Sequence, residues 1–202
     1  MLASEVLSDA RRLLQDISSD RWTDAMLLTW LNEGQLKIIS IAPSSNSEYM
    51  FFGLNHGVKQ TVPTVAYALI DVAYNMTGSS DRGSAITKAD EELLKLEDPD
   101  WATSTPSTTV VHWMQRPTET RTFSVYPPQP DGTAAVVELQ VCLYPTVAVD
   151  GDTELDFSDE FQQVLVDYIV YRAYSEDRAL EADDAAAAKH FQLFVEQLEL
   201  LK

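Results

Sequence analysis

The residues that could do chemistry are few and far apart. The three histidines are His56, His112 and His190, and none has a second ligand at the spacing of a metal site. The single cysteine, Cys142, alternates with apolar residues in a pattern typical of a buried strand. No histidine or basic cluster stands near it in the sequence to lower the pKa of its thiol. We therefore expect no bound metal and no catalytic residue of these two types.

A short acidic run resembles the start of a calcium-binding loop. It has carboxylates at alternate positions: Asp150, Asp152, Glu154 and Asp156. Such a loop needs glycine at its sixth position and glutamate at its twelfth, where this chain has Leu155 and Phe161. The glycine-containing segment 78–83 has neither the P-loop lysine nor the Rossmann glycine spacing. The sequence therefore predicts no cofactor.

Acidic residues beside tryptophan suggest one catalytic alternative. Glu33 lies close to Trp30 in the sequence, and Asp98 and Asp100 immediately precede Trp101. A glycosidase needs two carboxyl groups facing each other across a cleft, so a cell-wall glycosidase using Glu33 or Asp100 is a testable hypothesis. A tryptophan in the core and a capped loop explain the same residues without catalysis.

The composition limits the classes of partner. The chain has 202 residues, of which 45% are hydrophobic, so it can form the core of one domain or of a domain with an insertion. Its formal net charge of −18 opposes binding to nucleic acid and to anionic lipid. No run of about 18 apolar residues is present, so we expect no membrane contact. A plain acidic interaction domain is the alternative of another class.

The two ends of the chain are predicted to be helical. Apolar residues repeat at helical spacing over residues 4–17, and Thr23 is a suitable N-cap for a second helix that ends before Pro43. Residues 158–177 have apolar residues on two faces, with Ser158 as the expected N-cap, which indicates a central helix buried between others. Residues 181–201 are predicted to form the last helix.

The middle of the chain is predicted to be rich in strands. We expect strands over residues 57–62, 65–75, 110–114, 122–126 and 134–144, and a short helix over 89–96. The segment Pro127–Gly132 combines prolines with Asp-Gly, which indicates a hairpin turn between the last two strands.

The order of these elements predicts an α+β fold. We expect a helical bundle built from the N- and C-terminal helix pairs, with an inserted β-rich subdomain. The expected boundaries are residues 1–43 for the N-terminal helices, 44–150 for the insert and 151–202 for the C-terminal helices.

Many short motifs, in this order and over nearly the whole chain, resemble one known family. They are Leu14-x-Asp16, Arg21-Trp22-Thr23-Asp24, Leu28-x-Trp30-Leu31-Asn32-Glu33, Gly57-x-Lys59-Gln60-x-Val62-Pro63, Leu69-Ile70-Asp71-Val72-x-x-Asn75, Gly83-x-Ala85-Ile86, Pro99-Asp100-Trp101, Phe123-x-Val125-Tyr126-Pro127-Pro128, Tyr144-Pro145 and Tyr168-x-x-Tyr171-Arg172-Ala173-Tyr174-x-x-Asp177. In this respect the chain is similar to phage head-to-tail adaptors, also called connector, head-completion or tail accessory proteins.

The resemblance implies a structural viral protein rather than an enzyme. Members of that family bind beneath the portal after DNA packaging, usually as a ring of twelve copies, and extend the DNA channel toward the tail. The implied location is the head–tail junction of the virion, after synthesis in the host cytoplasm, and the implied partners are the portal protein, tail or nozzle proteins and further copies of the chain. An acidic channel would repel DNA phosphates, so the genome could pass without specific binding.

Two surfaces are candidates for these contacts. The C-terminal helix and tail form the candidate portal contact, with residues Phe191, Phe194, Glu199, Leu200, Leu201 and Lys202. The loops at 78–83 and 127–132 of the β-rich insert are candidates for contact with the tail or with a neighbouring copy.

Overall fold

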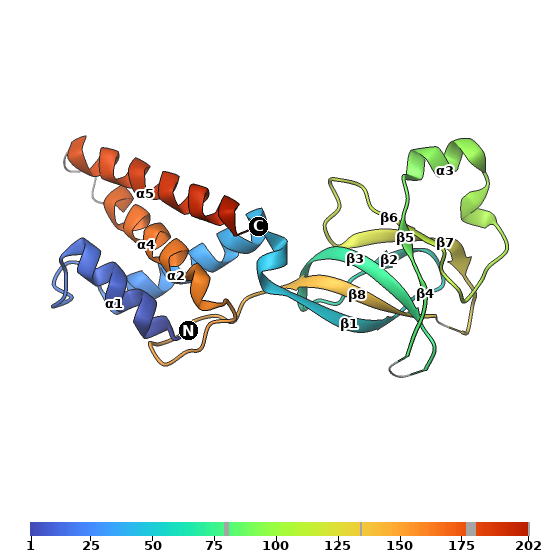
Figure 1. Cartoon of the computed structure of the whole chain (residues 1–202), viewed down its shortest axis with the longest axis horizontal. Coiled ribbons are helices and arrows are strands. Elements are labelled where there is room, and N and C mark those ends of the chain that lie inside the picture. The colour runs from blue at the N-terminus through green and yellow to red at the C-terminus, as the bar shows by residue number, and fades with distance from the viewer. Residues whose placement is uncertain (79–80, 134, 177–180, 202) are drawn as a thin grey trace. The chain divides into compact units, whose positions relative to one another are not determined.

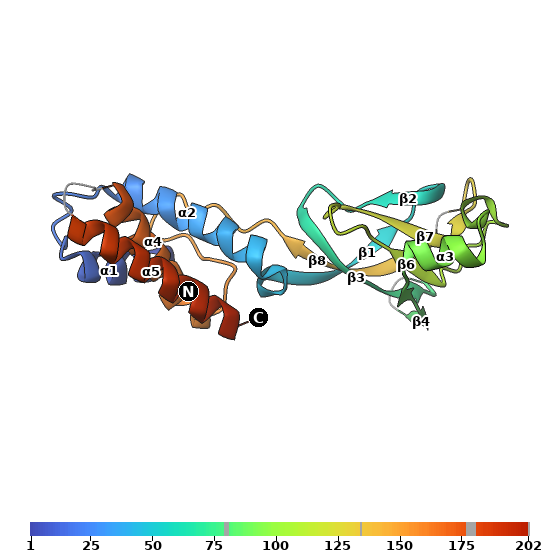
Figure 2. The same ribbon diagram turned by 90° about the horizontal axis from the view of Figure 1, so that it is seen from above.

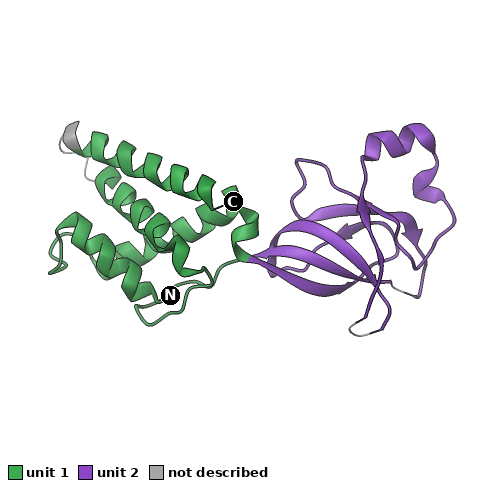
Figure 3. Ribbon diagram, viewed as in Figure 1, with its two compact units in different colours: residues 1–46, 144–202 green, residues 47–143 purple. Residues whose placement is uncertain are grey.

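A computed structural model describes residues 1–78, 81–133, 135–176 and 181–201, with only the backbone described for residues 181 and 182. The chain divides into two compact units (Figure 3), Met1–Asn46 together with Tyr144–Lys202, and Ser47–Leu143. We refer to them as the helical unit and the β unit. The described residues form five α-helices and two sheets, which confirms the expected mixed α+β class (Figure 1).

The first two helices of the helical unit are α1, Ala3–Leu14, and α2, Asp24–Ile41. The expected N-cap of α2 is confirmed, because the Thr23 side chain accepts the N–H of Met26 at 3.3 Å.

Helix α1 ends at Leu14, earlier than the expected residue 17. Gln15 adopts the left-handed conformation, with φ of 54°, and its N–H bonds back to carbonyls of the last turn.

Helix α4, Gln162–Glu176, is the centre of the helical unit. It contacts α1, α2 and α5, Glu181–Leu200, which confirms the expectation of a central helix. Its buried residues include Val164, Leu165 and Val170, which lie on more than one side of the helix.

The expected N-cap of this helix, Ser158, is wrong in one respect. A short 3₁₀ turn, η3, Asp159–Phe161, precedes α4, and Ser158 makes no side-chain capping hydrogen bond there.

The β unit contains two four-stranded sheets among the described residues (Figures 1 and 2). One sheet has the order β1-β8-β3-β4, with strands Ser47–Gly53, Val136–Leu143, Ala66–Met76 and Arg82–Ala85. The other has the order β2-β7-β6-β5, with strands Gly57–Thr61, Thr122–Gln129, His112–Met114 and Thr87–Lys88. Helix α3, Glu91–Glu97, follows β5, and the 3₁₀ turns η1, Pro43–Asn46, and η2, Trp101–Thr103, complete the elements.

Both sheets contribute to a common core. Strand β8 supplies Val137, Leu139 and Val141, while Trp113 of β6 and Phe123 of β7 come from the other sheet. Val137, Leu139 and Val141 alternate along β8 and so share the face on this core, while Glu138 and Cys142 on the other face are buried as well.

The expected hairpin between residues 122–126 and 134–144 is wrong. Strand β7 continues through Pro127 and Pro128 to Gln129, and β8 belongs to the other sheet, where it pairs with β1 and β3. A turn signal marks a change of direction, but it does not determine whether the next strand returns to the same sheet. Strand β1, the outer partner of β8, was not predicted at all.

The segment after β8 is bound to the helical unit by side chains of α2. The Asn32 side chain accepts the Ala148 N–H at 2.8 Å and donates to the Ala148 carbonyl at 2.9 Å. Gln35, which is almost fully buried, donates to the Thr146 carbonyl at 3.2 Å. These bonds satisfy backbone groups of an irregular segment, so residues 144–150 fold with the helices.

Candidate functional site

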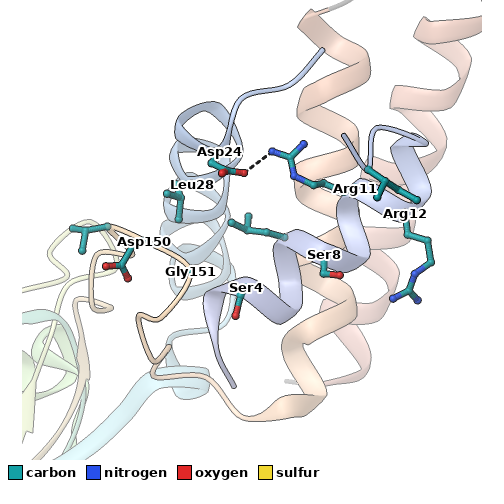
Figure 4. A pocket seen from close by; sticks show the side chains of 11 residues that line it. Ser4, Ser8, Arg11, Arg12, Asp24, Leu28, Asp150 and Gly151 are labelled. Carbon is teal, nitrogen blue, oxygen red and sulfur yellow. Dashed lines mark hydrogen bonds and ion pairs between the residues drawn. The ribbon is translucent and has the colours of Figure 1, made fainter. Parts of the chain in front are cut away.

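Helices α1 and α2 and the segment 149–151 enclose a pocket of about 590 Å³ in the helical unit (Figure 4). The residues that line it are Ser4, Leu7, Ser8, Arg11, Arg12, Ile17, Asp24, Leu28, Val149, Asp150 and Gly151. Among them, Ile17 and Val149 are strongly exposed aliphatic side chains. A concave surface with aliphatic and hydroxyl groups is suited to receiving an apolar side chain of another protein.

Two charged residues of the pocket, Arg11 and Asp24, belong to an ion-pair network at the corner between α1 and α2. The largely buried Arg11 guanidinium pairs with the Asp24 carboxylate at 2.6 Å, as Figure 4 shows, and with Asp16 at 3.3 Å. The Asp16 carboxylate also accepts the backbone N–H groups of residues 20–22. These bonds, above all the one from Trp22, lower the pKa of Asp16, so it remains ionised and holds the corner.

His112 and Cys142 occupy structural positions, whereas His56 is exposed. His112 contacts the Thr87 hydroxyl at 2.7 Å and stacks on Tyr126. Cys142 is fully buried in β8, and burial raises the pKa of its thiol to about 11, which disfavours the nucleophilic thiolate. Within the described ranges of the chain, no group of three or more His, Cys, Asp or Glu side chains could hold a metal ion.

The alternating acidic run stabilises a turn. The Asp150 carboxylate accepts the N–H of Asp152 and the hydroxyl of Thr153, at 3.1 and 2.9 Å. The Asp156 carboxylate accepts the N–H of Thr146 at 2.6 Å. Since these carboxylates bind backbone and hydroxyl donors of their own segment, their spacing has a structural explanation.

The acidic residues beside tryptophan also have structural contacts. Glu33 in the helical unit forms an ion pair with Arg172 at 2.9 Å. In the β unit, the Asp98 carboxylate accepts the N–H of Asp100 at 3.1 Å, and Trp101 is buried in the core. A tryptophan buried in this way has no free ring face on which a sugar could stack.

The candidate portal contact at the end of α5 is partly accessible. Leu200 is 86% exposed and Phe191 is 38% exposed, Glu199 is exposed and Leu201 is half-buried. Lys202 lies outside the described residues.

Phe194 does not lie on that surface. Its side chain is fully buried, and its ring lies 5.2 Å from that of Tyr168 on α4. It therefore serves as an anchor between α5 and α4, and its burial disagrees with the expectation that it belongs to the portal contact.

A buried polar cluster between α4 and α5 was missed in the sequence. The Asp167 carboxylate, with 2% of its surface exposed, contacts His190 Nδ1 at 2.7 Å and accepts hydrogen bonds from Gln163 and Gln197, both at 3.1 Å. An acidic residue in the middle of an apolar helix was the available signal, because a buried carboxylate requires partners. The cluster fixes how α5 lies on α4.

Several motif residues that carried the family resemblance hold the fold together. Asp16 binds the α1–α2 corner, Thr23 caps α2 and Asn32 binds residue 148. In the β unit, the Asn75 side chain accepts the Val110 N–H at 2.8 Å and donates to its carbonyl at 2.7 Å. These motif residues therefore have structural roles in the fold.

Comparison with known proteins confirms the family resemblance that these motifs carry. The family model described as SU10 adaptor protein matches residues 1–202. A search of curated proteins found no match to the chain. In the described part of the chain, no helix is both long enough and apolar enough to cross a membrane.

Proposed function

The chain belongs to the SU10 adaptor protein family, and from this membership we propose that it is a structural phage protein that binds the portal ring. In this role it joins head to tail and extends the DNA channel after packaging. The observation that carries the proposal is the match of the family model over the whole chain, so that both units belong to the adaptor.

The proposed assembly is a ring of about twelve copies at the head–tail junction of the virion. The helical unit acts as a bundle that packs against its neighbours, and the inserted β unit faces tail or nozzle proteins. The formal charge of −18 per copy supports a channel that repels DNA phosphates, so that the genome moves through it without specific binding.

The proposed portal contact is the C-terminal end of α5 with the tail that follows it. Leu200 offers a large exposed apolar side chain next to the exposed Glu199, and Phe191 adds a partly exposed ring on the same helix. Exposed apolar side chains of this size lose water on docking, which favours association. Leu201 and Lys202 are included as the continuation of the same end.

Native mass spectrometry of the protein mixed with the portal ring of the same phage tests the proposal. We expect one portal ring to gain the mass of about twelve chains. A well-folded protein that leaves the mass of the portal unchanged at micromolar concentration would contradict the proposed function.

A matched pair of variants tests the contact surface separately. Leu200→Glu places a charge at the proposed contact, and Leu96→Glu places one on α3 of the β unit at a side chain that is 80% exposed. We expect the Leu200 variant to bind the portal at least about tenfold more weakly, the effect of desolvating a charge at an interface. The Leu96 variant should bind normally, and equal binding by both variants would remove α5 from the contact.

A further inference from the structure

Strand β1, Ser47–Gly53, is an edge strand whose only charged residue is Glu48. It is the outermost strand of its sheet, and among the described residues it pairs on one side only, with β8, in a register that runs without a shift from Ser47 opposite Cys142 to Gly53 opposite Val136. Natural proteins protect edge strands with lysine, proline, bulges or short length. The seven residues of β1 contain no lysine, arginine or proline and no bulge.

The outward face of β1 is also apolar. Tyr49 and Phe51 are each 54% exposed, while Met50 and Phe52 alternate with them and pack against the core of the β unit. Regular strand geometry therefore places two aromatic rings side by side on the exposed face, beside a backbone edge that pairs with no described strand. An extended segment of another chain can pair with such an edge as a further strand of the sheet. Main-chain hydrogen bonds then supply affinity, and alternate side chains supply specificity.

The sequence of β1 is complementary to itself in one antiparallel register. When Met50 lies opposite Met50 of a second copy, all seven residues are paired, with Ser47 opposite Gly53. Tyr49 then lies opposite Phe51 twice, on the same face, and cross-strand aromatic pairs of this kind stabilise a sheet.

The same register keeps the only charges of the strand apart. Glu48 lies opposite Phe52, so the two Glu48 residues are separated by four positions, or about 13 Å along the strands. That distance exceeds the screening length of about 8 Å at physiological salt. A shift of the register by two residues in either direction would lose both Tyr49–Phe51 pairs, leaving one Tyr49–Tyr49 or one Phe51–Phe51 pair, and would leave residues of each strand unpaired.

We propose that β1 is a self-association surface and that its occupant is β1 of a second copy of this chain, in the register centred on Met50. The two sheets then continue across a twofold axis as one eight-stranded sheet. Because such a contact uses the same surface on both copies, it closes with two chains and leaves no β1 edge for a third copy. The proposal concerns the free protein and does not depend on the portal ring.

The first test is the mass of the full chain in solution as a function of concentration. A single strand pair forms a small interface of the weak class, below about 1,200 Å², so light scattering and sedimentation should extend to about 1 mM protein. We expect the mass to rise from one chain to two and not beyond. A mass of one chain at every concentration would overturn the proposal and leave the edge to an extended segment of a different protein.

A matched pair of lysine variants locates the surface. Phe51→Lys disrupts both aromatic pairs and places a charge on the edge, whereas Leu93→Lys changes a similarly exposed apolar residue on α3 of the same unit. We expect the Phe51 variant to remain a single chain at concentrations where the wild type is a dimer. The Leu93 variant should dimerise as the wild type does, and equal behaviour of the two variants would contradict the assignment.

Cysteine cross-linking tests the register. Met50→Cys places two thiols directly opposite each other, with Cα atoms about 4.5–5.5 Å apart, within the range of a disulfide. Glu48→Cys is the control, because its thiols would be about 13 Å apart along the strands. We expect a covalent dimer only from the Met50 variant after oxidation, and efficient cross-linking of the Glu48 variant would refute the register.

Salt dependence separates this contact from binding to a basic partner. Both copies carry −18, so added salt should strengthen the dimer by screening their repulsion. A dimer weakened by salt would indicate an interface between opposite charges and would overturn the proposed pairing.

Discussion

Replacing Gly34 by alanine should destabilise the helical unit, although alanine favours a helix. Gly34 lies on α2 where this helix contacts α4. A Cβ added there would lie 3.0 Å from Tyr168 Cδ1, 3.3 Å from Cγ of the same ring and 3.4 Å from Leu165 Cδ2. The Tyr168 ring has little room to move, because it is 8% exposed and lies 5.2 Å from the ring of Phe194 and 5.8 Å from that of Tyr171.

Two opposing effects determine the magnitude. Glycine in a helix is less favourable than alanine by about 1 kcal/mol, so the substitution gains roughly that amount from the backbone. Overpacking a well-filled core costs about 1–3 kcal/mol. The net effect on the free energy of unfolding should therefore be a loss of about 1 kcal/mol, which for a chain of this size lowers Tm by about 2–4 °C.

The assay is thermal unfolding followed by circular dichroism at 222 nm, where helices dominate the signal. Gly53→Ala is the control for replacing a glycine, because nothing lies within 4 Å of its added Cβ, and it should leave Tm unchanged or slightly higher. In a Tyr168→Leu background the ring is absent, so Gly34→Ala should become stabilising by up to about 1 kcal/mol. A Gly34→Ala protein that is more stable than the wild type, or a cost that persists without the ring, would refute the close α2–α4 contact.

Three other perturbations test the remaining structural assignments. Phe194→Ala removes the fully buried anchor of α5 and should cost about 3–5 kcal/mol in urea unfolding, whereas a surface residue would cost little. Cys142, whose pKa is raised to about 11 by burial, should react with a thiol reagent at pH 8 only after denaturant is added, and rapid reaction of the native protein would contradict its burial. Glu91 has its pKa lowered from 4.5 to about 2, chiefly by the hydrogen bond from Arg116, so its contribution to stability is present above about pH 4.5 and is lost as the pH falls toward 2. Glu91→Gln should therefore be less stable than the wild type in urea at pH 6, with the difference shrinking at pH 2.5, and a difference that does not change with pH would refute the ion-pair origin.

The elements that depend on near neighbours in the chain were predictable. Helix α2 was identified by its apolar period and by Thr23, and both are confirmed. Strands β2 and β3 were also predicted within one or two residues of their observed bounds. Side-chain periodicity and capping involve residues only two to four positions apart, so the sequence displays them directly.

The candidate site was predictable only in part. Phe191 and Phe194 belong to the same apolar stripe of α5, yet the first is partly exposed and the second is fully buried. Their periodicity is the same, and each ring packs on a tyrosine of α4, Phe191 on Tyr171 and Phe194 on Tyr168, so the difference in their burial comes from how the two helices pack. The polar partners of Asp167 depend on the same packing, because His190 and Gln197 come from the other helix.

The amino-acid sequence by itself determined the α+β class, the helices at both ends, the acidity of the surface and the resemblance to phage adaptors. The tertiary structure decided the order of the strands, in which β8 lies between β1 and β3 and belongs to a different sheet from β7. Backbone hydrogen bonds between strands are alike for nearly all residues, so local sequence does not specify which strands pair. Which strands pair depends on the burial of side chains that are far apart in the chain. The resulting strand order places β1 at the edge of its sheet.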